Sequence, residues 1–353
     1  AWDTSSPAPS RDLSRHTKTQ GLSAQELDRK RAARRAALQA EREAAGERED
    51  SMENPEEAGS PSGATRVAAV DCGTNSIRLL IADARTENGV TRLTDVVRLM
   101  RIVRLGEGVD ATGRLSDAAL ERTFAAADEY AALIREHGAQ KVRFVATSAT
   151  RDAENRTEFT DGIRARLGVE PEVISGDEEA ALSFAGAASV LAGESGVRTV
   201  VVDLGGGSTE FVLGVNGKVL AAKSTDMGCV RFTERHLVSD PPTEAEIALA
   251  RGDVLDMIAQ VLQTVPLATA DRLIGVAGTV TTVTAHALRL PEYSPEAIHG
   301  TELSSQAVDQ AASSLLHLSR AEREALPYMH PGRVDVIGAG ALIWQTIVDR
   351  MEE

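Results

Sequence analysis

Short apolar runs alternate with longer amphipathic stretches from about residue 65 to the end of the chain. The apolar runs have the length of buried β-strands, and the amphipathic stretches repeat with the period of an α-helix. This alternation is typical of an α/β fold. We predict strands at 66–71, 77–83, 141–147, 197–203 and 210–214. We predict helices at 116–137, 151–167, 176–191, 242–264, 279–290 and 335–351.

Residues 1–64 have a different pattern from the rest of the chain. They carry Pro, Ser and charged residues in blocks, with almost no β-branched or aromatic residues, so they cannot build a packed core. Ser23 followed by Glu26 is a capping-box pattern, and the Ala-, Arg- and Glu-rich stretch 24–45 predicts a solvated helix. The stretch 47–63 predicts a linker. We therefore interpret residues 1–64 as a disordered or helical extension.

Two segments of the chain resemble each other. Residues 68–83 read AAVDCGTNSIRLLIAD, and residues 200–215 read VVVDLGGGSTEFVLGV. Each is an apolar strand, an Asp, a Gly two positions later, a Ser five positions after the Asp, and a second apolar strand. Such a repeat predicts two related domains facing each other across a cleft. We expect them to span 65–190 and 191–353, and we leave open that the helix at 335–352 packs back on the first domain.

Composition and charge narrow the class of protein. The chain has 42% hydrophobic and 26% charged residues, as a globular protein does. No apolar run approaches the roughly 18 residues of a membrane span, and the first residues lack a signal-peptide pattern. We therefore expect a cytoplasmic protein with no membrane partner. The formal net charge of −15 argues against nucleic acid as a partner, because nucleic-acid binding normally needs a basic surface.

Glycine-rich turns at the two strand ends suggest a phosphate site. A strand that ends in Asp and turns through Gly-rich backbone can present N–H groups to a phosphate. Gly73 and the run Gly205, Gly206 and Gly207 supply such backbone. An Asp at a strand end can also hold a divalent cation or its water shell. One such loop is weak evidence, because Asp and Gly are common at hairpin tips, but two copies are much stronger.

These loops resemble the phosphate-1 and phosphate-2 motifs of the actin, Hsp70 and sugar-kinase superfamily. Within it, the chain is similar to the Ppx/GppA phosphatase family, in particular its short actinobacterial type, through the strings DCGTNSIRLLIAD, VATSATRDAENR, VISGDEEAALSF, VVDLGGGSTEFVLG and GVAGTVTT. The resemblance runs from about residue 66 to the end. It implies two ribonuclease-H-like (actin-like ATPase) domains with an interdomain cleft, hydrolysis of phosphoanhydride bonds, and Mg²⁺ as cofactor.

The resemblance also implies roles for particular residues. Glu179, in the string GDEEA, corresponds to the general base that activates water. Its place in the first turn of a helix favours the ionised form, which can accept a proton. The implied metal ligands are Asp71, Asp203 and Glu210. The implied phosphate-binding residues are Asn75, Ser76, Arg151, Gly205, Gly206, Gly207 and Ser208.

Three of these residues have purely structural alternatives. Glu179 can simply complement the positive end of its helix, and Glu210 can be a solvent-facing strand residue. Arg151 can form an ion pair at a helix start with Asp152 or Glu154. These alternatives stay open at the level of sequence.

The chain beyond residue 65 is acidic, so binding a long anionic substrate such as polyphosphate would require local positive patches. Arg98, Arg101 and Arg104 recur at a spacing of three along a predicted strand. Arg98 and Arg104 are then expected on one face of the strand, with Arg101 opposite. These arginines either extend the binding site or pair with surface carboxylates.

The expected reaction is attack by water on the terminal phosphoryl group of inorganic polyphosphate. Guanosine pentaphosphate is the alternative substrate. Two features favour polyphosphate: aromatic residues make up only 3% of the chain, without a base-stacking cluster, and the long C-terminal helical extension of larger members is missing. Alternatives of another class are a kinase or ATP-driven switch, and a non-catalytic polyphosphate or alarmone sensor. A homodimer is also left open.

Overall fold

The computed structural model describes residues 64–190 and 195–352. The first sheet starts at the beginning of this part of the chain. Its strands are β1 (Thr65–Cys72), β2 (Ser76–Glu87), β3 (Val90–Ile102), β4 (Lys141–Ala146) and β5 (Glu172–Val173). They lie in the order β3-β2-β1-β4-β5. Strands β1 to β3 form an antiparallel meander, β4 runs parallel to β1, and β5 runs parallel to β4. Alternate residues of β1 (Ala68, Val70 and Cys72) are buried, because successive side chains of a strand point to opposite faces.

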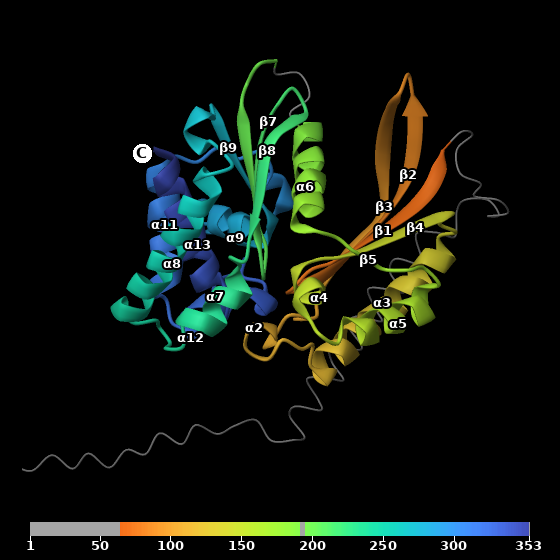
Figure 1. Ribbon diagram of the computed structural model, residues 1–353, viewed down its shortest axis with the longest axis horizontal. Coiled ribbons are helices and arrows are strands. Elements are labelled where there is room, and N and C mark those ends of the chain that lie inside the picture. The colour runs from red at the N-terminus through yellow and green to blue at the C-terminus, as the bar shows by residue number, and fades with distance from the viewer. Residues whose placement is uncertain (1–63, 191–194, 353) are drawn as a thin grey trace, which may run out of the picture. The chain divides into compact units, whose positions relative to one another are not determined.

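The second sheet repeats this arrangement (Figure 1). Its strands are β6 (Thr199–Leu204), β7 (Thr209–Val215), β8 (Lys218–Thr225) and β9 (Arg272–Val276). They lie in the order β8-β7-β6-β9, with β6 to β8 as an antiparallel meander and β9 parallel to β6. The predicted α/β fold with two related halves is therefore confirmed.

Corresponding positions of the repeat occupy corresponding places in the two sheets. Asp71 lies opposite Arg78 in the pairing of β1 with β2. Asp203 lies opposite Glu210 in the pairing of β6 with β7. In both halves the Asp therefore ends the first strand of the meander, next to the hairpin turn that leads into the second.

The helices of the first half are α2 (Val109–Thr112), α3 (Asp117–Glu136), α4 (Ser148–Asp152) and α5 (Arg156–Leu167). Helices α3 and α5 lie against each other and bury Tyr130, Phe159 and Ile163 in the core of the first sheet. The prediction of one helix over 151–167 is wrong. Two helices form because Ala153 takes an extended backbone conformation and Asn155 turns to bond the backbone of Leu115 through both ends of its amide.

Helices cover both faces of the second sheet. Its helices are α6 (Gly176–Val190), α7 (Cys229–His236), α8 (Glu244–Leu262), α9 (Ala277–Ala287), α10 (Pro295–Ile298), α11 (Ser305–His317), α12 (Arg320–Glu324) and α13 (Ile337–Glu352). Two short 3₁₀ turns occur at Leu267–Thr269 and Pro331–Arg333. Helix α6 packs on β7 and β8, whereas α9, α11 and α13 lie on the opposite side (Figure 1). Burial of β6 and β7 on both faces follows from this arrangement.

Two packing relations differ from the sequence-based domain division. Helix α6, which the division placed with the first half, packs its residues Ala180 and Phe184 against Val201 and Val212 of the second sheet. Helix α13 has α7, α8, α9 and α11 as its main partners, rather than packing back on the first half. The described residues belong to one compact unit of the chain, so the boundary at 190/191 stays a prediction.

The remaining predicted elements agree with the structure to within a few residues. Helix α8 was expected at 242–264, and its start is fixed by a capping box between Thr243 and Glu246. The elements without a counterpart among the predicted ranges are strands β3, β5, β8 and β9 and helices α2, α7, α10, α11 and α12. None of the described helices has the length and apolar character needed to cross a membrane. The helix predicted at 24–45 and the linker at 47–63 lie outside the described residues.

Candidate active site

The two hairpin turns of the repeat meet each other at the centre of the described unit. The hydroxyl groups of Thr74, in the first turn, and Ser148, at the start of α4, lie 2.9 Å apart. A Cβ atom placed on Gly206 would lie 3.0 Å from the Thr74 Cβ, and one on Gly207 would lie 2.6 Å from the Thr74 Oγ1. The glycine run is therefore needed for close approach of the two turns, and any larger residue at these positions forces them apart.

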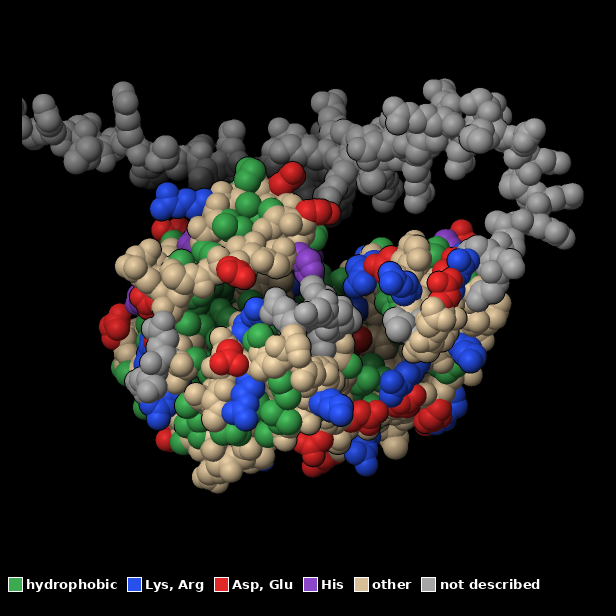
Figure 2. Space-filling model, turned by 90° about the horizontal axis from the view of Figure 1, so that it is seen from above, with side chains coloured by type: hydrophobic (Ala, Val, Ile, Leu, Met, Phe, Trp, Pro, Cys, Tyr) green, Lys and Arg blue, Asp and Glu red, His purple; other side chains and the backbone are tan. Residues whose placement is uncertain are grey.

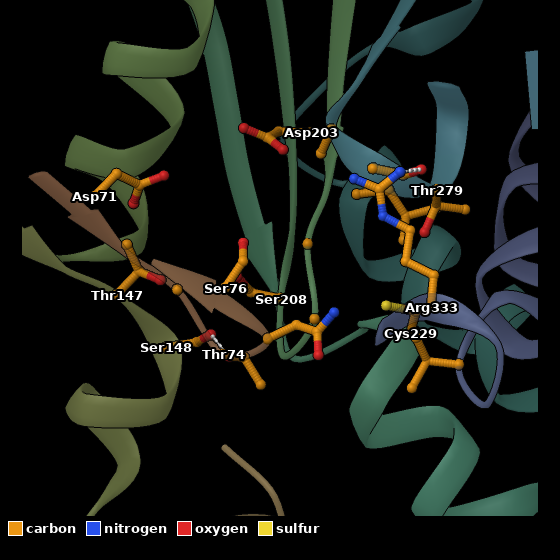
Figure 3. Close-up of a pocket in the computed structure, with 18 of the residues that line it drawn as sticks. Asp71, Thr74, Ser76, Thr147, Ser148, Asp203, Ser208, Cys229, Thr279 and Arg333 are labelled. Carbon is orange, nitrogen blue, oxygen red and sulfur yellow. Dashed lines mark hydrogen bonds between the residues drawn. The ribbon is translucent and has the colours of Figure 1, made fainter. Parts of the chain in front are cut away.

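The two turns enclose a pocket of about 90 Å³. Asp71 lies on one side of this pocket, and Thr279 and Arg333 lie on the other (Figure 3). The predicted site residues that line it are Asp71, Asn75, Ser76, Glu179, Asp203, Gly205, Gly206 and Ser208. The predicted site residues outside its lining are Arg151, Gly207 and Glu210. Folding thus brings residues from both halves together in one pocket. Most of the site residues that the resemblance implied line it.

Glu179 occupies the first turn of α6 and reaches the pocket. Burial raises the pKa of this carboxyl group to about 7, against a lowering effect of Arg151 and with further raising by Asp203 and Asp71. The helix N-terminus was expected to favour the ionised form. Burial outweighs it, since a carboxylate that loses water becomes harder to ionise. The group is thereby close to its titration point at neutral pH.

The other acidic residues add to the negative charge around Glu179. Burial raises the pKa of Glu210 well above its ordinary value, and the neighbouring Glu179 and Asp203 raise it further. Glu210 is only 1% exposed and accepts a hydrogen bond from Ser224 at 2.8 Å, so it is not a solvent-facing strand residue. Desolvation also raises the pKa of Asp71, Arg78 lowers it, and Asp203 raises it. The carboxylates therefore repel one another and favour a cation among them.

Among the described residues, the carboxylates do not complete a metal site by themselves. Among the residues that the structure describes, no group of three or more His, Cys, Asp or Glu side chains is close enough together to hold a metal ion. Mg²⁺, however, usually keeps several waters and takes only one or two carboxylates together with phosphate oxygens. Asp203 is also held in place by a hydrogen bond from the Ser183 hydroxyl. The chemistry of the donor set thus fits Mg²⁺ beside a phosphate.

Arg151 lies behind Glu179 rather than on the pocket surface. Its Nη1 donates to the carbonyl oxygen of Ile174 at 2.9 Å and to the Glu179 Oε2 at 3.4 Å. The alternative pairing with Asp152 is not formed, since Asp152 contacts Arg231 instead. The geometry places Arg151 as a support of the Glu179 carboxylate.

Arg333 is a pocket residue that sequence reasoning missed. It lies in the turn before α13, and its Nη1 donates to the Gly278 carbonyl at 3.1 Å and to the Thr282 hydroxyl at 3.0 Å. A Cβ atom on Gly332 would meet Ile102 at 2.4 Å, so the turn is pressed against the first half of the chain. The only local signal was a Pro-Gly-Arg turn, which does not indicate a phosphate site.

A wider cavity of about 870 Å³ adjoins the pocket and shares Asp71, Arg78, Met100 and Arg333 with it. Most of its lining is apolar. The other polar and aromatic residues along it include Arg98, Arg143, Tyr293, Tyr328 and His330. Figure 2 shows the surface hollowed between the two halves, with basic and acidic side chains interspersed around the hollow. A ligand larger than the pocket therefore has room to extend beside it.

The three arginines of the predicted strand are paired with carboxylates. Arg98 pairs with Asp95 at 2.8 Å, Arg101 with Glu129 at 2.5 Å and Arg104 with Asp335 at 2.5 Å. Strand β3 ends at Ile102, and Arg104 has a φ of 50°, so Arg104 does not share a strand face with Arg98. Of the three, Arg98 alone lines the wider cavity. The idea of a shared Arg98–Arg104 face is therefore wrong.

Known proteins that are similar in sequence or in structure point to one family. The sequence profile of the Ppx/GppA phosphatase family matches residues 81–353. Exopolyphosphatase 2 of Mycobacterium tuberculosis is 49% identical over 294 residues, which cover 82% of this chain and 92% of that protein. The crystal structure of an exopolyphosphatase-like protein is 46% identical, with a TM-score of 0.78, and covers 82% of this chain and 89% of its own. The Ppx/GppA family member of Aquifex aeolicus is 32% identical, with a TM-score of 0.68 and coverage of 82% and 92%.

Proposed function

The chain belongs to the Ppx/GppA phosphatase family, and on this premise we propose that it is an exopolyphosphatase. In the proposed reaction, the oxygen of a water molecule bonds to the terminal phosphorus of inorganic polyphosphate and the bridging P–O bond breaks. One phosphate and a chain one unit shorter leave. The relative that is 49% identical over 82% of this chain bears the name exopolyphosphatase 2, which supports hydrolysis of phosphoanhydride bonds.

The observation that carries the proposal is Glu179, a pocket carboxylate whose pKa burial raises to about 7. A general base acts best when its pKa lies near the working pH. Glu179 takes the proton of the attacking water as the new P–O bond forms. Arg151 holds the carboxylate from behind at 3.4 Å and lowers its pKa, which keeps a useful fraction ionised at neutral pH.

Hydroxyl and guanidinium groups are available for the phosphate. Ser76 and Ser208 line the pocket at corresponding positions of the two turns, and Arg78 and Arg333 line it as well. These donors suit the oxygens of a terminal phosphoryl group, on which negative charge is spread during the transfer. We assign Asn75, Gly205 and Gly206 to the same phosphate-binding surface. Arg151, which the resemblance placed on the phosphate, is assigned here to orient Glu179.

We propose that Asp71, Asp203 and Glu210 are the residues that hold Mg²⁺. When bound, the ion offsets the negative charge of the phosphate oxygens. The support for this assignment is that desolvation, and then the charge of Asp203, raises the pKa values of Asp71 and Glu210, a cost that a nearby cation would offset. Magnesium dependence of phosphate release is its direct test.

The two cavities suggest how a long substrate is accommodated. The pocket of about 90 Å³ has room for a terminal phosphoryl group, and the adjoining cavity of about 870 Å³ can take the units that follow it. Arg98 and Arg143 lie along this second cavity and can contact those units. Guanosine pentaphosphate is the second candidate, because the mostly apolar lining with Tyr293 also suits a nucleobase.

The deciding experiment measures phosphate release from long-chain polyphosphate, guanosine pentaphosphate and ATP in parallel, with and without Mg²⁺. We expect the highest kcat/KM for polyphosphate and little release without Mg²⁺. A higher kcat/KM for guanosine pentaphosphate reverses the substrate assignment. Absence of release from all three substrates supports the non-catalytic sensor instead. A cytoplasmic location and a homodimer stay predictions.

A further inference from the structure

Arg231 of α7 lies outside the pocket lining and yet bonds to both halves of the described unit. We propose that Arg231 is a positioning residue for the hydrolysis, coupling the second glycine turn to the short helix that supports Glu179. The inference rests on the proposed function, because it takes Glu179 as the base.

The guanidinium of Arg231 bonds to three separate segments. Its Nε donates to the Gly207 carbonyl at 2.9 Å, in the second glycine turn. Its Nη1 contacts the Asp110 Oδ1 at 2.5 Å, and its Nη2 contacts the Asp152 Oδ2 at 2.6 Å, both in the first half. Only 12% of the Arg231 side chain is exposed, so solvent screens these ion pairs weakly. The planar guanidinium can serve three acceptors at once because its five N–H donors point in fixed directions.

The backbone around Arg231 is fixed to the glycine turn. The N–H groups of Cys229, Val230 and Arg231 donate to the carbonyl oxygens of Gly205 and Gly206, at 3.0, 2.8 and 3.2 Å. The start of α7 is therefore anchored on the turn through hydrogen bonds that helix ends normally leave unmade. A displacement of the second glycine turn therefore also displaces the Arg231 side chain.

Helix α4 links Asp152 to the proposed base, Glu179. Asp152 is the last residue of α4, which is only five residues long and follows Thr147. The preceding residue, Arg151, donates to Ile174 and to the Glu179 carboxylate. A helix this short is not stable by itself, so tertiary contacts such as the Asp152–Arg231 ion pair hold it in place.

Arg231 thus fixes the distance between two parts of the proposed reaction that belong to opposite halves. The second turn carries Ser208, which lines the proposed phosphate pocket, and α4 carries Arg151, which supports Glu179. Displacement of such groups by about 1 Å can slow a reaction about 100-fold. Because Arg231 has no place in the pocket lining, its loss leaves the groups that contact substrate present and acts on kcat more than on KM.

The test compares Arg231→Ala, Asp152→Asn and Asp110→Asn in the full chain, with polyphosphate as substrate. Asp110→Asn is the matched control, since Asp110 contacts the same guanidinium but lies in α2, which lines no part of the pocket. Asp110 also pairs with Arg235, at 2.7 Å, so its substitution disturbs two ion pairs. We expect Arg231→Ala and Asp152→Asn to lower kcat about 10- to 100-fold with KM changed less than about threefold. We expect Asp110→Asn, which disturbs two ion pairs, to lower the melting temperature at least as much as Asp152→Asn and to leave kcat within about threefold.

If Arg231 is merely structural, the loss of kcat follows the loss of melting temperature, and Asp110→Asn lowers kcat at least as much as Asp152→Asn. That order, or an unchanged kcat in folded Asp152→Asn, overturns the inference. If Arg231→Ala does not fold, the kcat of Asp152→Asn alone tests the inference. A wild-type chain that releases no phosphate from polyphosphate refutes the proposed function, and the inference with it. An active wild type with an unimpaired Asp152→Asn refutes the inference alone.

Discussion

The two hairpins of the repeat share a backbone arrangement and differ in charge. In the first, Asp71 faces Arg78 across the strands at 3.4 Å, and both side chains are about half exposed. In the second, Asp203 faces Glu210, and Glu210 is only 1% exposed. The first pair therefore joins two opposite charges, whereas the second brings two carboxyl groups together in a dry environment, which raises the pKa of Glu210.

The same supersecondary unit can therefore hold either a pair of opposite charges or a pair of carboxyl groups across its strands. Cross-strand partners of opposite charge stabilise a hairpin, and like charges directly opposite destabilise it. The second hairpin tolerates the unfavourable pair because β6 and β7 are buried between helices on both faces. In the proposed reaction, a cation held by Asp203 and Glu210 would offset this repulsion. Substitutions in the second hairpin, at Glu179 and in the first hairpin should therefore have different effects.

The largest expected effect is on catalysis by Glu179, where charges from both hairpins meet. Glu179→Gln keeps the shape of the side chain but removes its ability to accept a proton. We expect kcat for polyphosphate to fall about 10²- to 10⁴-fold with KM nearly unchanged. The check is steady-state phosphate release by both proteins. Activity within a few-fold of wild type removes Glu179 from the proposed mechanism.

The next effect is on stability as a function of pH in the metal-free protein. A folded-state pKa of about 7 lies above the ordinary value of 4.5, so Glu179 binds a proton more readily in the folded chain. Its contribution to stability is complete below pH 4.5 and is lost as pH rises through about 7. Glu179→Gln has no such loss and should be more stable than wild type at pH 8 by up to about 3 kcal/mol.

Melting temperatures of both proteins at pH 4.5 and pH 8, with a chelator present, measure this effect. We expect Glu179→Gln to melt about 5 °C above wild type at pH 8, with the gap closing at the lower pH. A gap that is equal at the two pH values contradicts a raised pKa for Glu179.

A moderate effect is expected when one charge of the second hairpin is removed. Glu210→Gln should raise the Mg²⁺ concentration for half-maximal activity about 10-fold. The same change should raise the melting temperature of the metal-free protein, because it removes the cost of desolvating a carboxylate and the repulsion from Glu179 and Asp203. Titration of activity with Mg²⁺ tests the first effect and thermal unfolding the second. An unchanged Mg²⁺ requirement excludes Glu210 from the metal site.

The smallest effect is expected from the first hairpin. Arg78→Ala breaks an exposed ion pair, so we expect stability to change by less than about 1 kcal/mol. Because Arg78 lines both cavities, KM for long polyphosphate should rise about threefold. Arg101→Ala is the matched control, since Arg101 lines neither cavity. Equal KM values for the two variants show that Arg78 does not contact substrate.

Much of the fold could be predicted because its signals are local. Apolar runs of strand length and turns with Asp and Gly indicated both hairpins, and the repeat indicated that Asp71, Ser76, Asp203 and Ser208 hold corresponding places. The break near Ala153 was missed, since it depends on a hydrogen bond between Asn155 and a segment about 40 residues away in the chain.

The sequence by itself determined the strands of the two repeat hairpins, the hairpin tips and the identity of the groups at them, because these follow from periodicity and turn preference over a few neighbouring residues. Only the tertiary structure decided that Arg333 joins the pocket, that Arg151 supports Glu179 rather than facing the substrate, and that the glycine turn gives room to Thr74. It also raised the pKa of Glu179 to about 7, although the helix end by itself favours the ionised form. Loss of water and the approach of charges distant in the chain arise only when the two halves pack, and at short range in a dry site they outweigh the local effect of a helix end.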